Sequence, residues 1–249
     1  MTAPVLRVTA MRRRFGGVLA VDDVSLDLAE GELHAVIGPN GAGKTTLIHL
    51  LSGALRPSAG TIVLDGRDIT GLAMHRRVRL GLARSYQITS LFPNFTVREN
   101  LALALQGTGQ GRGGPDDRDR ARAELDAVGL GARADQLAGA LAHGERRQLE
   151  LGLALATGAR ILLLDEPMAG MGPEEAARIT SLIEALKRRR TILLVEHDME
   201  AVFRLADRIS TLVYGRLIAS GAPDEIRRHP EVRRAYLGEE DSEVGHAER

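Results

Sequence analysis

The sequence predicts an α/β protein with a parallel sheet, and three segments carry this prediction. Each is a short apolar run that ends in residues able to meet a ligand: residues 33–37 precede a glycine-rich loop, residues 161–164 precede Asp165 and Glu166, and residues 191–195 precede a turn with two acidic residues and a histidine. Such continuous apolar runs are typical of buried parallel strands. Ligands in these folds bind at the carboxyl ends of the strands, so we expect a site there.

The composition of the 249-residue chain excludes several classes of protein. Lys plus Arg and Asp plus Glu both number 33, so the formal net charge is zero and gives no general attraction to nucleic acid. The absence of Cys excludes disulfides and thiolate metal sites. No apolar stretch reaches the roughly 18 residues that cross a bilayer, and the N-terminus lacks the apolar core of a secretory signal. We therefore expect a soluble or peripheral protein.

The loop after residues 33–37 matches the phosphate-binding pattern G-x-x-x-x-G-K-[ST]. Its residues are Gly38, Pro39, Asn40, Gly41, Ala42, Gly43, Lys44 and Thr45. The glycines let successive backbone N–H groups point inward, and the helix predicted from Thr46 adds the positive end of its dipole. Lys44 would reach the β- and γ-phosphates of ATP, Thr45 would ligate Mg²⁺, and Thr46 would offer a neighbouring hydroxyl.

Asp165 and Glu166 supply the acidic groups that an ATPase needs. We expect Asp165 to hold Mg²⁺ through water and Glu166 to act as the general base that polarises the attacking water. Alone, the pair is equally compatible with a strand followed by a solvated acidic turn, and the phosphate loop favours the catalytic interpretation. His197, at the end of residues 191–195, is compatible with a structural role or with a contact to the γ-phosphate.

In this order, the motifs resemble those of the ATP-binding subunit of an ABC transporter, over about residues 5–238. The resemblance implies a P-loop NTPase (RecA-like) α/β core with an antiparallel β subdomain and an inserted α-helical subdomain. It assigns residues 1–87 and 159–238 to the nucleotide-binding core with its β subdomain and 88–158 to the helical subdomain. A polar tail would follow at 239–249.

The same resemblance assigns roles to further residues, with ATP and Mg²⁺ as cofactors. Gln87 matches the glutamine that senses Mg²⁺ and connects the core to the helical subdomain. Phe15 matches the aromatic residue that stacks on adenine, although an ordinary core phenylalanine is the alternative. Glu166 and His197 match the catalytic glutamate and the switch histidine.

The signature segment of the family, L-S-G-G-Q, is altered here. The corresponding residues are Leu141, Ala142, His143, Gly144 and Glu145. In the family this segment begins a helix and closes on ATP held by the opposite subunit, so Leu141 and Gly144 are candidate nucleotide contacts. The missing serine hydroxyl removes a hydrogen bond worth about 1.5–3 kcal/mol, and Glu145 adds a carboxylate near the phosphates. The acidic residue that usually couples the two subunits after Glu166 is also absent, with Gly172 in its place.

Four stretches narrow the resemblance to the ATPases of branched-chain amino acid importers, and they are residues 15–25, 166–171, 195–199 and 235–239. The importer family implies a second ABC ATPase subunit, identical or similar, and membrane permeases docked near Gln87 and Ser90–Phe95. It also implies indirect contact with an extracytoplasmic solute-binding protein and a place on the cytoplasmic face of the membrane, with no nucleic acid partner. Urea and short-chain amide importers look much alike.

Two further functions remain as alternatives. The altered signature is compatible with a nucleotide-gated regulatory subunit that hydrolyses ATP poorly. A soluble ABC ATPase acting on DNA or ribosomes is disfavoured, because the chain has one cassette and no heptad run. Outside the motifs, we expect a mobile loop at 107–115. We also expect Lys187–Arg190 to end a helix that begins after Pro173, where the cations would complement the helix dipole.

Overall fold

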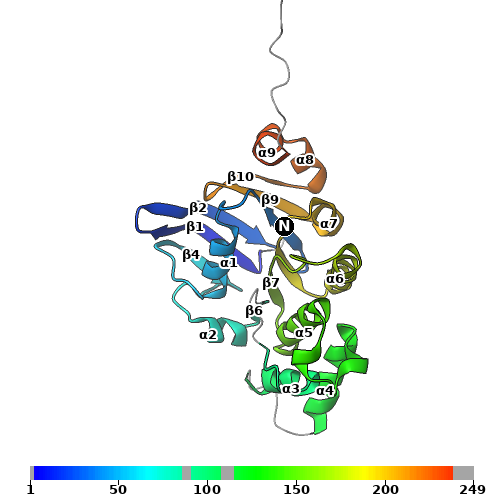
Figure 1. Ribbon diagram of the computed structural model, residues 1–249. Helices are drawn as coiled ribbons and strands as arrows, with labels where there is room; N and C mark the ends of the chain where they lie inside the picture. The colour runs from blue at the N-terminus through cyan, green and yellow to red at the C-terminus, as the bar shows by residue number, and fades with distance from the viewer. Residues whose placement is uncertain (1–2, 86–90, 108–114, 238–249) are drawn as a thin grey trace, which may run out of the picture.

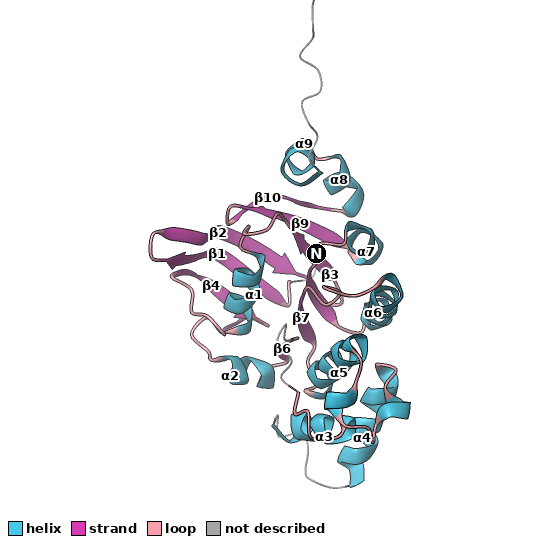
Figure 2. Ribbon diagram, in the orientation of Figure 1, coloured by secondary structure: helices cyan, strands magenta, loops and turns pink. Residues whose placement is uncertain are grey.

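The computed structural model describes residues 3–85, 91–107 and 115–237, and these form two sheets with helices packed against them (Figures 1 and 2). The smaller sheet is antiparallel, with the order β2-β1-β4-β5. Its strands are β1 (Leu6–Phe15), β2 (Val18–Leu28), β4 (Ala59–Leu64) and β5 (Arg67–Asp68). The antiparallel sheet agrees with the β subdomain that the family resemblance implied.

The larger sheet has six strands in the order β10-β9-β3-β8-β7-β6. All neighbouring strands in it are parallel except β9 and β10, which pair antiparallel at one edge. The strands are β3 (Leu33–Ile37), β6 (Leu82–Arg84), β7 (Ile161–Asp165), β8 (Thr191–Val195), β9 (Arg208–Val213) and β10 (Arg216–Gly221). The three apolar runs that predicted the fold are thus the adjacent central strands β3, β8 and β7, and their carboxyl ends lie at one edge.

Helices cover the larger sheet on both faces. The helices of the described residues are α1 (Lys44–Ser52), α2 (Met74–Arg79), α3 (Val97–Gly107), α4 (Pro115–Ala127), α5 (His143–Ala156), α6 (Pro173–Leu186), α7 (Met199–Leu205), α8 (Pro223–Arg228) and α9 (Pro230–Val232). Of these, α3 and α4 pack against each other and against α5. Helix α1 lies on the face shared with the smaller sheet, whereas α6 and α7 lie on the other face (Figure 1). None of the helices in the described ranges combines the length and apolar character needed to cross a membrane.

The apolar core has two parts, one on each face of the larger sheet. In β3, Leu33, Ala35 and Ile37 pack toward the helical side, while Val36 packs toward α1 and the smaller sheet. Because both faces are buried, this strand is apolar throughout except at His34. Helix α1 is therefore enclosed between the two sheets, which fixes the loop that precedes it.

The helix after Pro173 ends earlier than the sequence predicted. The helix after Pro173 ends at Leu186, so the expectation that Lys187–Arg190 form its last turn is wrong. Lys187 leaves the helical conformation, with ψ of 140°, and Arg188 has a left-handed φ of 69°, so the chain reverses into β8. Lys187 Nζ instead lies 2.9 Å from Asp207 Oδ1. The expected mobile loop at 107–115 and the polar tail at 239–249 lie wholly or mostly outside the described residues.

Candidate nucleotide-binding and catalytic site

The predicted phosphate loop joins β3 to α1, and two of its glycines are required by close packing. A Cβ atom on Gly38 would lie 2.0 Å from the Leu212 carbonyl oxygen, and one on Gly43 would lie 2.3 Å from that of Ala20. Gly43 also has φ of 104°, which L-residues rarely adopt. The loop is thus held between β2 and β9, with its curled backbone set before any ligand arrives.

Lys44 opens helix α1 and its side chain folds back over the loop. Its ammonium donates hydrogen bonds to the carbonyl oxygens of Gly38, at 2.7 Å, and Pro39, at 3.0 Å. Burial lowers the pKa of Lys44, while the negative charges of Glu166 and Asp165 act in the opposite direction. The charge is therefore fixed at the mouth of the loop and faces the two acidic residues. Thr45 and Thr46 are half-buried in the first turn of α1.

Asp165 is the last residue of β7 and is buried, because the adjacent strands cover it. Its Oδ2 lies 2.9 Å from Nη2 of Arg84, the last residue of β6. Burial raises the pKa of Asp165, and the Arg84 guanidinium opposes that rise. Among the described residues, the buried Oδ1 of Asp165 has no hydrogen-bond partner. A buried carboxylate oxygen with unused acceptor capacity fits a role in holding Mg²⁺ through water.

Glu166 and His197 follow neighbouring strands and contact each other. His197 Nε2 lies 2.6 Å from Glu166 Oε1. Glu166 has a left-handed φ of 48°, an uncommon conformation for a residue other than glycine, and its N–H donates to the Val195 carbonyl oxygen at 2.8 Å. The strained backbone turns the Glu166 side chain toward the histidine, so the arrangement can place a carboxylate and an imidazole beside one water molecule.

Glu196 holds the loops after β7 and β8 together, a role that the sequence did not indicate. Its Oε1 accepts from the Met168 N–H at 2.8 Å, and its Oε2 accepts from the His197 N–H at 2.9 Å. Burial raises the pKa of Glu196, and its bonds with backbone N–H groups oppose the rise. The only available sequence signal was a carboxylate directly after a fully apolar strand.

The residues present fit a Mg²⁺–nucleotide complex better than an all-protein metal site. In the described parts of the chain, no three His, Cys, Asp or Glu side chains lie close enough together to hold a metal ion. Mg²⁺ commonly uses one or two carboxylates and takes its other ligands from phosphates and water. Asp165 and Thr45 are the candidate protein ligands here, and Gln87, predicted as a third, lies outside the described residues.

The altered signature segment begins helix α5, as the resemblance implied. Ala142 occupies the N-cap, and its N–H donates to Glu145 Oε2 at 3.0 Å. The Gly144 N–H donates to Oε1 of Glu175, in α6, at 3.3 Å. Leu141 has a buried side chain, so only its backbone is available to a nucleotide. Two amides of this helix start therefore already bond carboxylates of the same chain.

Phe15 ends β1 at the hairpin that leads to β2. Its ring is 42% exposed and the Arg13 guanidinium carbon lies 4.6 Å from the ring centroid. Since Ala20 of β2 contacts the loop at Gly43, this hairpin lies beside the phosphate loop. An exposed aromatic face there is compatible with stacking on a base and does not fit an ordinary core residue.

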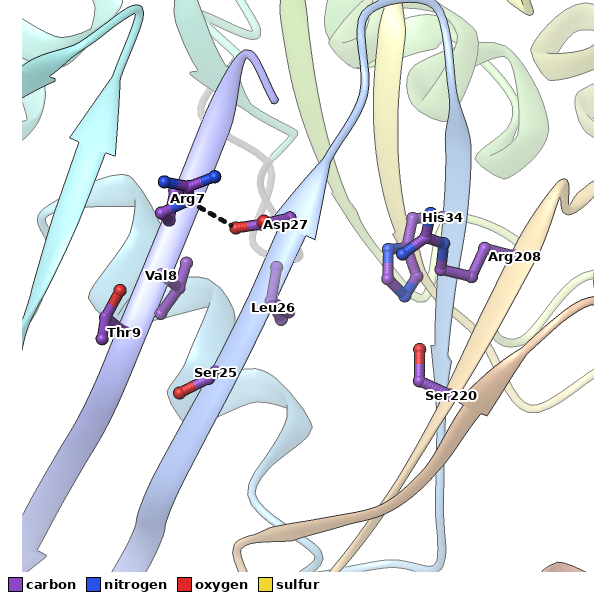
Figure 3. A pocket seen from close by; sticks show the side chains of 9 residues that line it. All are labelled: Arg7, Val8, Thr9, Ser25, Leu26, Asp27, His34, Arg208 and Ser220. Carbon is purple, nitrogen blue, oxygen red and sulfur yellow. Dashed lines mark hydrogen bonds and ion pairs between the residues drawn. The ribbon is translucent and has the colours of Figure 1, made fainter. Parts of the chain in front are cut away.

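A separate cavity of about 400 Å³ lies among β1, β2, β3, β9 and β10 (Figure 3), and its lining includes no residue of the phosphate loop. Its lining includes Arg7, Asp27, Arg208 and the buried His34. His34 Nε2 lies 2.8 Å from Ser210 Oγ. Burial, together with the charge of Arg208, lowers the pKa of His34 to about 4, so this histidine is neutral near pH 7. His34 is in the first half of β3, whereas the phosphate loop follows the end of that strand.

The strand–loop–helix unit, the paired sheets and the order of the motifs define an ATP-binding cassette. Comparison with protein families agrees: residues 21–169 match the ABC transporter family, and residues 216–242 match the family of branched-chain amino acid ATP-binding cassette transporters. The chain therefore belongs to the ABC transporter ATPases, and the predicted family and α/β fold are confirmed.

Similar proteins match over nearly the whole chain. The high-affinity branched-chain amino acid transport ATP-binding protein LivG of Salmonella typhimurium is 42% identical, across 96% of this chain and 100% of the relative. BraF of Pseudomonas aeruginosa, with the same description, is 40% identical over the same shares. The crystal structure of MJ1267, an ATP-binding cassette of an ABC transporter in its ADP conformation, gives a TM-score of 0.86 at 29% identity, across 96% of this chain and 100% of that one.

Proposed function

We propose that this chain binds and hydrolyses ATP to energise the uptake of branched-chain amino acids, or of a related small polar solute, through partner permeases. Two relatives that are 40% and 42% identical are described as ATP-binding proteins of branched-chain amino acid transport. The match of residues 216–242 to a family of the same description supports the same substrate class. The single observation that carries the catalytic part is the Glu166–His197 contact opposite the phosphate loop.

In the proposed reaction, ATP binds with its phosphates against the amides of Gly38–Thr45 and the Lys44 ammonium. Asp165 and Thr45 would hold Mg²⁺, and the bound ion would supply positive charge that neutralises the phosphates. Glu166 accepts a proton from the attacking water, and His197 orients the Glu166 carboxylate. Phe15 would stack on adenine, and Gln87, which lies outside the described residues, stays a predicted contact to the metal.

The proposed working unit is a dimer with a second ABC ATPase subunit, identical or similar. Each nucleotide would meet Leu141 and Gly144 of the opposite subunit at the start of α5. Since Glu175 already accepts from the Gly144 amide, closure requires this carboxylate to move aside, and Glu145 adds a second negative charge close to the phosphates. The resulting cost would slow this step relative to a cassette with the usual signature.

The proposed permease contact lies near the start of α3. Phe92 and Phe95 are 54% and 41% exposed, and their ring centroids are 5.4 Å apart, so they form a small apolar surface. Permease docking there would place the chain on the cytoplasmic face of the membrane and connect it indirectly to a solute-binding protein. We also propose the domain division that the family resemblance implies, with residues 1–87 and 159–238 as the nucleotide-binding core and residues 88–158 as the helical subdomain.

The test replaces Glu166 by Gln in the chain assembled with its permeases in liposomes. Removing a general base lowers turnover by about 10²- to 10⁴-fold, while ATP binding persists. Glu174→Gln, an exposed change in the first turn of α6, is the control and should leave turnover unchanged. Uptake of labelled leucine that follows ATP turnover would support the substrate class. Full turnover in Glu166→Gln would remove this residue from the mechanism.

A further inference from the structure

Arg84 makes a buried contact that the proposed reaction does not use. It ends the edge strand β6, which pairs parallel to β7 with Arg84 opposite Leu163. Its side chain reaches Asp165 Oδ2 at 2.9 Å, and the two side chains are only 7% and 0% exposed. Arg84 is thus the ion-pair partner of a predicted metal ligand, placed there by the backbone of the adjacent strand.

The pair is incomplete on both sides. A guanidinium and a carboxylate often form two parallel hydrogen bonds, but here only Nη2 and Oδ2 are joined. Within the described part of the chain, the buried Arg84 Nε and Asp165 Oδ1 have no hydrogen-bond partner. A pair built only for stability would be expected to satisfy these atoms, because a buried unsatisfied polar group is costly. The unpartnered Oδ1 keeps acceptor capacity that a second cation could use at the same carboxylate.

Lys44, another cationic side chain near Asp165, is already hydrogen-bonded to backbone oxygens. The Lys44 ammonium donates to the carbonyl oxygens of Gly38 and Pro39. Without Arg84, the buried Asp165 carboxylate would therefore lack a directly bonded counter-charge among the described residues. Breaking a buried ion pair in this way is strongly destabilising.

We propose that Arg84 is a positioning residue for the metal site, which holds the Asp165 carboxylate as its counter-charge when no metal is bound and yields part of this role to Mg²⁺ when the Mg²⁺–nucleotide complex binds. This inference rests on the proposed function, because it requires Asp165 to serve that complex. Mg²⁺ must compete with the guanidinium for the carboxylate, so Arg84 weakens metal-dependent binding while it stabilises the ligand-free protein.

The test compares thermal unfolding of the full chain, as wild type and Arg84→Met, in EDTA, with Mg²⁺ alone, with ATP plus EDTA, and with ATP plus Mg²⁺. Losing a buried ion-pair partner lowers the unfolding temperature in EDTA by roughly 10 °C. The inference predicts that ATP with Mg²⁺ restores most of this loss and that ATP with EDTA does not. The Mg²⁺-dependent gain in ATP affinity, measured by titration, should also be larger in Arg84→Met than in wild type.

Two variants keep the test decisive. Arg84→Lys retains the charge and should lie between wild type and Arg84→Met in EDTA, so it serves if the methionine variant fails to fold. Arg160→Met is the control. Arg160 directly precedes β7 and also forms an ion pair with an aspartate, Asp65, but its side chain is half exposed. The control variant should leave the Mg²⁺-dependent shift unchanged.

The outcomes separate this inference from the proposed function. A normal Mg²⁺–ATP shift in wild type, with Arg84→Met destabilised equally in all four conditions, would overturn the inference alone and make Arg84 a purely structural residue. No Mg²⁺–ATP shift in wild type would overturn the proposed function and the inference with it.

Discussion

Arg77 provides the sharpest stability prediction, because it is a fully buried arginine bonded to backbone carbonyls alone. Its Nη1 donates to the carbonyl oxygens of Leu50, at 2.9 Å, and Leu51, at 2.8 Å, which end helix α1. Its Nε and Nη2 donate to those of Leu72, at 2.9 Å, and Thr70, at 2.8 Å. Burial lowers the pKa of Arg77 to about 10, so it remains charged at neutral pH.

The magnitude for Arg77→Met follows from these contacts. Four hydrogen bonds from a charged donor contribute about 1.5–3 kcal/mol each, and the desolvation of a buried guanidinium, several kcal/mol, offsets much of their sum. We expect a net loss of about 3–5 kcal/mol in the free energy of unfolding. In a chain of this size, each kcal/mol shifts the unfolding temperature by about 2–4 °C, which gives a decrease of roughly 6–20 °C.

The assay is urea unfolding followed by circular dichroism, with thermal unfolding as a second readout. Arg79→Met, an exposed change on the same helix α2, is the matched control and should lie within about 0.5 kcal/mol of wild type. If Arg77→Met unfolded within about 1 kcal/mol of wild type, the claim that Arg77 fastens the end of α1 would be refuted.

Three other changes test the site and its surroundings. The pKa of His34 falls from 6.5 to about 4 on folding, so the neutral histidine contributes fully to stability above pH 6.5. About 3 kcal/mol of this contribution is lost as the pH falls toward 4. His34→Gln should therefore flatten the pH dependence of the free energy of unfolding in urea over this range, and a pH dependence equal to that of wild type would contradict the prediction. Gly43→Ala should weaken ATP binding at least about tenfold by equilibrium titration, since its Cβ would meet the Ala20 carbonyl, whereas Gly66→Ala, with open space at its Cβ, should bind normally. Glu196→Gln should lower turnover about tenfold with little change in ATP affinity, because either the Met168 or the His197 amide loses its acceptor oxygen. Equal losses of turnover and of ATP affinity would count against a positioning role for Glu196.

The sequence predicted the parts of this molecule that depend on local pattern. The apolar runs of β3, β7 and β8 predicted buried strands, and the glycine spacing of residues 38–43 predicted the curled loop, because periodicity and backbone freedom are local properties. The placement of Glu166 and His197 each at the end of a buried strand followed from the same reasoning, and the resemblance supplied their proposed roles, whereas the adjacency of the two strands came from the structure.

The contacts made by long side chains could not be predicted. Arg84 meets a residue 81 positions away, and Arg77 meets carbonyl oxygens 26 and 27 positions away. Such contacts depend on strand order and helix placement, and an arginine in the sequence carries no sign of its partner. Glu175, which accepts from the start of α5, was hidden for the same reason. The end of α6 was misplaced because a cationic run resembles a helix terminus, while the left-handed Arg188 that ends it is not evident from the sequence.

The central claim is that the loop at residues 38–45 and the Lys44 ammonium bind the phosphates of ATP. Equilibrium titration of ATP in the presence of Mg²⁺ tests it most directly, with Lys44→Met as the perturbation and Lys187→Met, which removes the only other lysine in the chain, as the control. The account predicts that wild type and Lys187→Met bind alike and that Lys44→Met binds at least about thirtyfold more weakly. Folded wild-type protein without affinity for ATP, or equal binding by Lys44→Met, would contradict it.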